Sequence, residues 1–287
     1  MIIDIHTHAF PTIVRQTRQR FFQDEPAFEL LYASPKARLA GASDIIAVMD
    51  AQGVDKSVIF GFPWRNADTF KRNNDYILEA VARYPDRLIG FCCLDPTHRD
   101  APDEVERCLK AGMSGVGELA FYASGIDGGC LECLDPIMTL AKIHDCPVMV
   151  HTNEPVGHSY PGKSPNTLAQ ISALVRRFNK NRIILAHWGG GLFFYALLKK
   201  QMREELANVW FDTAASPYLY RPDIYPLALS IAGKEKILLG TDFPLLEPQR
   251  YFKEMAQAGL TAEQHKAVCG GNAARLFGLW PAKPLAR

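Results

Sequence analysis

Eight short apolar runs alternate with longer segments of helical periodicity along this 287-residue chain. The runs cover residues 2–5, 57–62, 88–94, 115–119, 148–151, 183–187, 209–213 and 237–242. Continuous apolar runs of this length are typical of strands that are buried on both faces, as in a parallel sheet with helical crossovers. Because eight such strands close into a barrel of about 250 residues, the pattern predicts an α/β fold, a single (β/α)8 TIM barrel.

An open, doubly wound sheet is the alternative, but no Gly-x-Gly-x-x-Gly motif follows the first run. We therefore expect one domain over residues 1–287. The long segment 9–42 separates the first strand from its helix and is rich in aromatic side chains, which predicts a cap over the barrel mouth. Helices are expected at 44–52, 74–84, 101–111, 131–144, 167–178 and 192–206, with one or two closing helices in 261–279.

Metal-binding side chains stand at the carboxyl ends of several runs. His6 and His8 close the first run, and His151, His187 and Asp242 each end a later one. Because the carboxyl ends of barrel strands meet at one mouth, we expect these five side chains to converge. Imidazole and carboxylate ligands suit Zn²⁺, and also Mn²⁺, Fe²⁺ or Co²⁺. The sequence therefore predicts a divalent metal site, with Zn²⁺ as the first candidate.

Glu118 ends the fourth run after two glycines. Its role decides whether the predicted site holds one metal ion or two. As a bridging carboxylate it would divide the ligands between two ions, whereas pairing with Lys163 or Arg65 at the mouth, or binding substrate, would leave one. A carboxylate beside a cation stays ionised, so Asp242 could ligate the metal and also accept a proton from an attacking water. His187 would either ligate a second ion or polarise the substrate.

Four further side chains are predicted to contact a substrate. His158, Tyr160 and Lys163 lie in the polar loop 152–166, directly after the fifth strand. Arg65 follows the second strand and is expected to clamp a substrate carboxylate, because a planar guanidinium binds a carboxylate through two parallel hydrogen bonds. The alternatives are a solvated position at the rim for Arg65 and plain loop structure for His158.

The combined motifs resemble the amidohydrolase superfamily. They are His6-x-His8, His151, His187-Trp188-Gly189-Gly190-Gly191 and Gly240-Thr241-Asp242-Phe243-Pro244. The chain is most similar to the branch that includes aminocarboxymuconate semialdehyde decarboxylase and related metal-dependent TIM-barrel hydrolases, from the first strand to residues 272–277. The decarboxylase relatives imply one metal on His6, His8, His151 and Asp242, with His187 as catalytic acid/base. Glu118 instead is similar to binuclear nucleases of the TatD type and phosphotriesterase-like hydrolases.

Three functions are compatible with these residues. We expect first a metal-dependent hydrolase, in which a metal-activated water attacks a small lactone, amide or ester that bears a carboxylate. The runner-up is a metal-dependent non-oxidative decarboxylase of an unsaturated or aromatic acid. A barrel that binds a metal or ligand without turnover is the third, but a structural zinc site closes its coordination sphere, usually with cysteines, and here the ligands are expected at an open mouth.

Composition excludes other partners. With 32 basic and 31 acidic residues the net charge is +1, and no basic stripe favours a nucleic acid or an anionic membrane. No apolar run approaches the roughly 20 residues of a membrane span, and the first residues are typical of a core strand rather than a signal peptide. Seven scattered cysteines fit reduced thiols. We therefore expect a cytoplasmic protein with a small-molecule substrate, and the decarboxylase relatives imply a homodimer.

Overall fold

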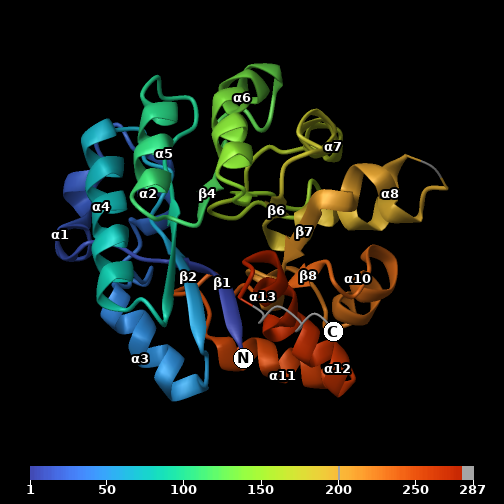
Figure 1. The fold of residues 1–287 in the computed structure, drawn as a ribbon. Helices are drawn as coiled ribbons and strands as arrows, with labels where there is room; N and C mark the ends of the chain where they lie inside the picture. Colours follow the sequence, from blue (N-terminus) through green and yellow to red (C-terminus); the bar gives the residue numbers. More distant parts are fainter. Residues whose placement is uncertain (200, 280–287) are drawn as a thin grey trace, which may run out of the picture.

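A computed structural model describes residues 1–199 and 201–279, so the last eight residues of the predicted domain lie outside it. Its strands form one sheet in sequence order, each parallel to the next (Figure 1). They are β1 (Ile3–His8), β2 (Lys56–Phe60), β3 (Leu88–Cys92), β4 (Gly115–Leu119), β5 (Val148–Val150), β6 (Ile183–Leu185), β7 (Val209–Asp212) and β8 (Ile237–Leu238). The predicted (β/α)8 barrel is confirmed.

Backbone hydrogen bonds join the two ends of the sheet. The N–H of Ile5 donates to Leu239 O at 2.9 Å, and the N–H of His8 donates to Phe243 O at 2.8 Å. In the other direction, the N–H of Asp242 donates to His6 O at 2.9 Å. These bonds nearly close the barrel and place the segment after β8 beside the histidines of β1.

Helices surround the barrel and cover the outer face of its strands (Figure 1). The outer helices are α3 (Ala42–Gln52), α4 (Ala67–Arg83), α5 (Ala101–Lys110), α6 (Gly128–Ile143), α7 (Leu168–Arg177), α10 (Ile224–Ala232) and α11 (Pro248–Gln257). Side-chain caps fix several starts: Asn66 accepts the N–H of Thr69, and Thr167 accepts the N–H of Gln170 in a capping box. The predicted closing segment forms α12 (Ala262–Lys266), η4 (Ala267–Gly271) and α13 (Asn272–Leu276).

The barrel interior is a small apolar cluster, distinct from the larger one between strands and helices. Ile3 and Ile5 of β1 lie in it with Phe60 of β2 and Phe91 of β3. Ala273 and its neighbours in α13 belong to the same cluster, so α13 packs against the amino-terminal end of the strands. This packing leaves the carboxyl-terminal end of the barrel for a functional site.

A β-bulge in β1 turns both histidines into the barrel. Asp4 pairs with Ser57 and Thr7 with Ile59, so three steps along β1 match two along β2. Simple alternation would place Ile5 and His6 on opposite faces, but the extra residue lets both face inward. The ring of His6 consequently lies 5.1 Å from that of Phe60, an interior residue.

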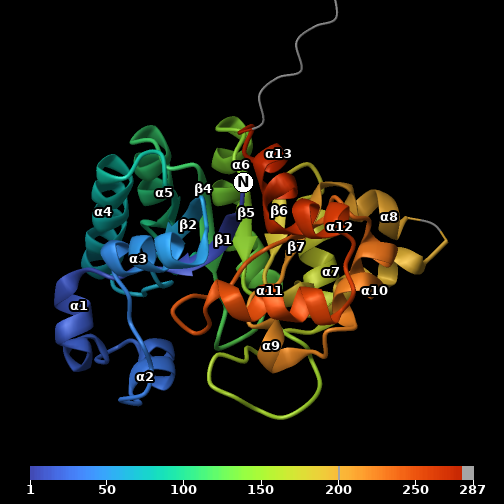
Figure 2. The same ribbon diagram turned by 90° about the horizontal axis from the view of Figure 1, so that it is seen from below.

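The segment 9–42 forms α1 (Thr12–Gln16), η1 (Arg18–Phe21) and α2 (Pro26–Tyr32). It is anchored by buried aromatic contacts; the rings of Phe28 and Trp64 are 4.3 Å apart. In Figure 2, α2 and α9 (Ser216–Leu219) project at the same end of the barrel as the yellow-green loop after β5. These three segments surround the carboxyl-terminal mouth.

The predicted helix at 192–206 is wrong. This part of the chain forms the turns of η2 (His187–Leu197), then α8 (Met202–Glu205) and η3 (Leu206–Asn208). Residues 188–191 have φ between +61° and +91°, and three consecutive glycines make this left-handed path accessible. Within residues 1–199 and 201–279, no helix combines the length and apolar character that crossing a membrane requires.

Candidate metal centre

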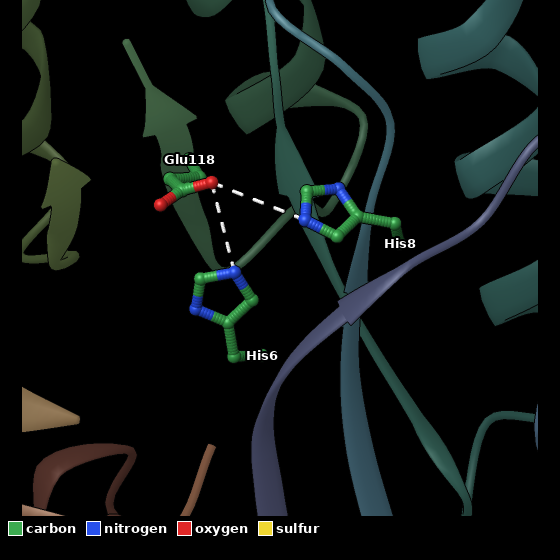
Figure 3. A group of neighbouring side chains, drawn as sticks. All are labelled: His6, His8 and Glu118. Carbon is green, nitrogen blue, oxygen red and sulfur yellow. Dashed lines mark ion pairs between the residues drawn. The ribbon is translucent and has the colours of Figure 1, made fainter. Parts of the chain in front are cut away.

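Two carboxylates face the histidines of β1. Glu118 Oε2 lies 3.6 Å from His6 Nε2 and 3.9 Å from His8 Nε2 (Figure 3). Asp242 Oδ1 lies 3.7 Å from His6 Nε2 and 3.1 Å from His8 Nε2. Two ligands that each lie 2.0–2.1 Å from one tetrahedral ion are about 3.4 Å apart. His6, His8 and Glu118 thus have the mutual spacing of ligands around a common cation, and Asp242 lies beside the same two histidines.

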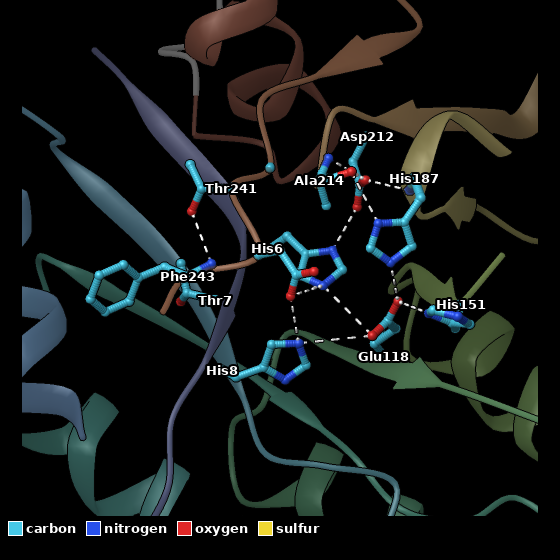
Figure 4. Close-up of polar contacts among 12 residues, drawn as sticks. His6, Thr7, His8, Glu118, His151, His187, Asp212, Ala214, Thr241 and Phe243 are labelled. Carbon is cyan, nitrogen blue, oxygen red and sulfur yellow. Dashed lines mark hydrogen bonds and ion pairs between the residues drawn. The ribbon is translucent and has the colours of Figure 1, made fainter. Parts of the chain in front are cut away.

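The other oxygen of Glu118 faces a second pair of histidines. Glu118 Oε1 lies 3.0 Å from His151 Nδ1 and 3.3 Å from His187 Nε2 (Figure 4). The rings of His151 and His187 are 4.9 Å apart, and those of His6 and His187 are 5.4 Å apart. All six predicted ligands therefore meet at one site, and Glu118 lies between the two histidine groups. Its carboxylate pairs with neither Lys163 nor Arg65.

Hydrogen bonds on the far side of each ring fix which nitrogen faces the centre. A carbonyl or carboxylate oxygen can only accept, so the outer nitrogen that it contacts carries a proton. The acceptors are Asp212 Oδ2 for His6 Nδ1 at 2.8 Å, Gly61 O for His8 Nδ1 at 2.9 Å, Ala214 O for His187 Nδ1 at 3.0 Å and Gly162 O for His151 Nε2 at 3.0 Å. Each ring thus keeps its inward nitrogen for a cation, as metal-bound histidines do.

The inward nitrogen of His6 has no hydrogen-bond partner. His6 is fully buried, and its Nε2 is among the few buried side-chain atoms without one in the described part of the chain. Buried polar atoms are normally paired. A divalent cation between His6, His8, Glu118 and Asp242 would give this nitrogen a partner, so the donor set fits such an ion.

Burial and charge act in opposite directions on the ionisation of the centre. Burial alone would raise the pKa of Glu118 and Asp242, but the neighbouring histidines outweigh it and hold the pKa of each carboxyl below its ordinary value. Burial alone would lower the pKa of His187, but the hydrogen bond and charge of Glu118 raise that pKa to about 9. Glu118 and Asp212 likewise outweigh burial and raise the pKa of His6. The carboxylates are therefore ionised at neutral pH.

Two of these residues have left-handed backbone conformations. His187 has φ of +53° and Asp242 has φ of +60°. For residues with a Cβ this region costs about 1–2 kcal/mol, so it persists only where the surroundings hold it. At Asp242, the N–H bond to His6 O and the following bond from the N–H of Leu245 to Asp242 O fix the turn.

Asp212 is a site residue that the sequence prediction missed. At the end of β7, its Oδ2 accepts from His6 Nδ1, and its Oδ1 accepts the backbone N–H groups of His187 and Ala214 at 2.8 and 3.0 Å. The signal was present, because Asp212 lies one residue before the end of the run 209–213 and is the last residue of β7, much as Asp242 ends 237–242. Asp4, in contrast, binds Thr241 and the backbone N–H of His6 and contacts no imidazole.

A cavity of about 530 Å³ opens above the centre. Its walls are mainly aromatic and aliphatic, with the rings of Phe62 and Tyr122 stacked at an interplanar angle of 10°. Arg38 contributes a cationic group at the rim, where its Nη1 lies 3.5 Å from Glu247 Oε1. The volume is that of a small-molecule site. Lining residues include Leu31, Tyr32, Arg38, Phe62, Tyr122, His158, Tyr160, Tyr218, Leu219 and Leu245.

The predicted substrate residues divide into two groups. His158 and Tyr160 line the cavity. Lys163 lies behind this wall and binds Glu154 at 2.9 Å. Arg65 is exposed and is not a lining residue; its backbone N–H binds Glu25, which orients the chain at the end of β2. The cationic side chain at the mouth is instead that of Arg38.

Comparisons with known proteins agree with this barrel. A family model described as amidohydrolase matches residues 3–279. Two gamma-resorcylate decarboxylases are 22% identical (Polaromonas sp., 82% of this chain and 86% of that protein) and 25% identical (Rhodococcus jostii, 85% and 90%). A structure of 5-carboxyvanillate decarboxylase from Novosphingobium aromaticivorans, complexed with manganese and 4-hydroxy-3-methoxy-5-nitrobenzoic acid, has a TM-score of 0.74 at 18% identity, covering 97% of this chain and 96% of that chain.

Proposed function

The chain belongs to the amidohydrolase family, and on that premise we propose that it is a metal-dependent carboxy-lyase that removes the carboxylate of a small aromatic acid. The observation that carries the proposal is a cluster of metal-ligand side chains at the floor of an aromatic-lined cavity. The curated relatives are decarboxylases. They favour this reaction, which the motifs alone ranked second, over hydrolysis.

The residues that would hold the cation are His6, His8, Glu118 and Asp242, with His151 on the other oxygen of Glu118. Mn²⁺ is the first candidate, since the related 5-carboxyvanillate decarboxylase structure contains manganese, and Zn²⁺ is the second. When bound, a divalent cation would attract the anionic substrate and neutralise charge beside the bond that breaks.

The cavity walls select and orient the substrate. The parallel rings of Phe62 and Tyr122 offer flat apolar surfaces to an aromatic ring. Burial raises the pKa of Tyr122, so its phenol stays a neutral hydrogen-bond donor. Arg38 is the one arginine or lysine among the described lining residues. We assign it to a second anionic or hydroxyl group at the far side of the substrate ring.

His187 supplies the proton. The bond between the ring carbon and the carboxylate breaks, its electron pair stays on the ring carbon, carbon dioxide leaves, and one proton takes its place. With a pKa of about 9, His187 is protonated at neutral pH. Its Nε2 lies at the floor of the cavity beside Glu118, within reach of a substrate bound there. The apolar walls limit water, which favours protonation by the protein.

Hydrolysis is the second candidate, and the position of Glu118 is the observation that favours it. The carboxylate lies between His6 and His8 on one side and His151 and His187 on the other. A carboxylate between two ligand groups suits a pair of ions, as in many metal-dependent hydrolases. Two ions per chain in the purified protein would favour this alternative.

The test is turnover by protein stripped with a chelator and reloaded with Mn²⁺ or Zn²⁺. The panel contains 2,6-dihydroxybenzoate and 5-carboxyvanillate, matched arenes without the carboxylate, and lactones, amides and esters that bear one. We expect metal-dependent release of carbon dioxide from an aromatic acid, with the fold retained after stripping. Cleavage of a lactone, amide or ester without carbon dioxide would replace decarboxylation by hydrolysis. Loss of the fold on stripping would indicate a structural metal.

A further inference from the structure

The outer nitrogen of His151 is held by a surface loop rather than by the barrel. Its Nε2 donates to the carbonyl of Gly162, in the loop between β5 and α7, at 3.0 Å. The other three rings are fixed by acceptors in segments that directly follow strands: Gly61, Asp212 and Ala214. The Gly162 carbonyl therefore holds the outer side of the ring while Nδ1 faces Glu118 Oε1 at 3.0 Å.

The base of this loop is fastened by buried amide groups. Asn153 Nδ2 donates to Ser164 O at 3.0 Å, and Asn153 Oδ1 accepts the N–H of Ser164 at 2.9 Å. Asn166 Nδ2 donates to the carbonyl of His151 at 3.2 Å. These bonds bring residues 153 and 164 together at the base of the loop. They do not hold the segment between these two residues, which needs contacts of its own.

Lys163 holds this segment through three hydrogen bonds. Its Nζ donates to Glu154 Oε1 at 2.9 Å, to His158 O at 3.2 Å and to the carbonyl of Val156. Tyr160 Oη donates to the other oxygen, Glu154 Oε2, at 2.9 Å. An ammonium group has three N–H donors, so Lys163 has none left for a substrate. Its side chain is 14% exposed and that of Glu154 is 20% exposed, so solvent screens this ion pair less than a surface pair.

Gly162 also touches the cap. Its φ is +93°, and a Cβ built on it would lie 3.1 Å from Leu31 Cδ2 of α2. The left-handed conformation and this close approach both favour glycine. The carbonyl that orients His151 is thus held between the cap on one side and Lys163, the next residue, on the other.

We propose that Glu154, Tyr160 and Lys163 form a clamp that holds the Gly162 carbonyl on His151 Nε2, so that the ring presents Nδ1 to Glu118 and to a cation bound there. Lys163 and Glu154 are positioning residues in this scheme. The metal-binding half of the inference rests on the proposed function. The orientation of the ring does not, and it can be measured without metal.

The experiment compares full-length wild type, Lys163→Met, Lys163→Arg and Glu154→Gln. Lys71→Met is the matched control, because Lys71 is exposed on α4 and its side chain makes no hydrogen bond or ion pair with the described residues. The first readout is histidine ¹⁵N NMR of metal-free protein, with His151→Gln to assign the signal. We expect the Nε2–H proton of His151 to exchange slowly with solvent in wild type and Lys71→Met, faster in Lys163→Met and Glu154→Gln, and slowly again in Lys163→Arg, because only the held Gly162 carbonyl protects it.

The second readout is the Mn²⁺ dissociation constant from electron paramagnetic resonance. Loss of an outer partner of a metal ligand commonly weakens affinity 10- to 100-fold, so we expect at least about tenfold in Lys163→Met. An unchanged exchange rate of the His151 Nε2–H proton in Lys163→Met, or a faster exchange with Mn²⁺ affinity within twofold of wild type, would overturn the clamp. Wild type that binds neither Mn²⁺ nor Zn²⁺ would overturn both the proposed function and the metal-binding half of this inference, while the exchange comparison still decides the other half. If Lys163→Met does not fold, Glu154→Gln decides by the same readouts.

Discussion

Asp212→Asn changes one atom of a buried side chain and should reverse the tautomer of His6. The backbone N–H groups of His187 and Ala214 both point at Oδ1 of Asp212. An asparagine must therefore place its amide oxygen there, which turns its NH₂ group toward His6 Nδ1. The amide NH₂ group then faces the N–H of His6 Nδ1, so two donors oppose each other. This repulsion is removed only if the proton of the ring moves to Nε2.

The expected loss of metal affinity follows from the direction in which His6 Nε2 points. It is the buried, unpaired nitrogen that faces Glu118 and Asp242 at 3.6 and 3.7 Å, so a proton fixed on it leaves no lone pair there for a cation. Outer partners of metal ligands are commonly worth 10- to 100-fold in affinity, which is about 1.4–2.7 kcal/mol. Because Asp212 holds both His6 and the backbone of His187, we expect the upper part of this range.

The assay is Mn²⁺ titration of metal-free protein, followed by electron paramagnetic resonance. Asp4→Asn is the control. Like Asp212, Asp4 is a buried carboxylate, but it lies on the first strand, and its replacement leaves every hydrogen-bond partner of the imidazoles in place. Burial raises the pKa of Asp4 to about 7, so a neutral amide is a mild change there. Asp212→Asn binding within threefold of wild type, or Asp4→Asn weakening binding equally, would contradict the assigned role of Asp212.

Three further predictions concern catalysis and protonation. Asp242→Asn should lower kcat at least about 100-fold with the thermal midpoint within a few degrees of wild type, and residual turnover above a few per cent would remove Asp242 from the mechanism. Arg38→Met should raise KM about tenfold for a substrate with a second anionic group and little for its neutral analogue; equal effects would exclude the contact. Mn²⁺ binding at pH 7.5 should release about one proton, because Glu118 and Asp212 raise the pKa of His6 and keep this ligand ring charged in metal-free protein. The apparent Mn²⁺ affinity should then rise with pH, and calorimetry in buffers of different ionisation enthalpy should give no proton release if His6 is already neutral.

Strand-end chemistry was enough to predict the fold and the meeting of six side chains at one mouth of the barrel. His151, His187 and Asp242 all follow the last residue of a short buried strand, where a parallel barrel brings them together. Asp212 fits the same rule and was missed because it was considered only as part of an apolar run. Its role depends on a partner 206 positions away, His6, and no local pattern shows that contact.

Three features depended on tertiary structure. The bulges in β1 and β4 aim His6, His8 and Glu118 inward, and a one-residue register shift leaves no mark in apolar patterning. The segment 192–206 has helical periodicity, but the left-handed backbone at 188–191 and the barrel contacts of η2 override it. Arg38 replaced Arg65 at the mouth because the fold of residues 9–42 decides which arginine reaches the cavity.

The most direct measurement is the isotopic composition of the product formed by Mn²⁺-loaded protein from 2,6-dihydroxybenzoate or 5-carboxyvanillate in deuterated water enriched in ¹⁸O. Decarboxylation predicts one deuterium on the carbon that bore the carboxylate, no ¹⁸O in the arene, and one carbon dioxide released per arene. No carbon dioxide from either acid, together with ¹⁸O in the carboxylate of a cleaved lactone, amide or ester supplied to the same protein, would contradict the proposed reaction and assign the centre to hydrolysis.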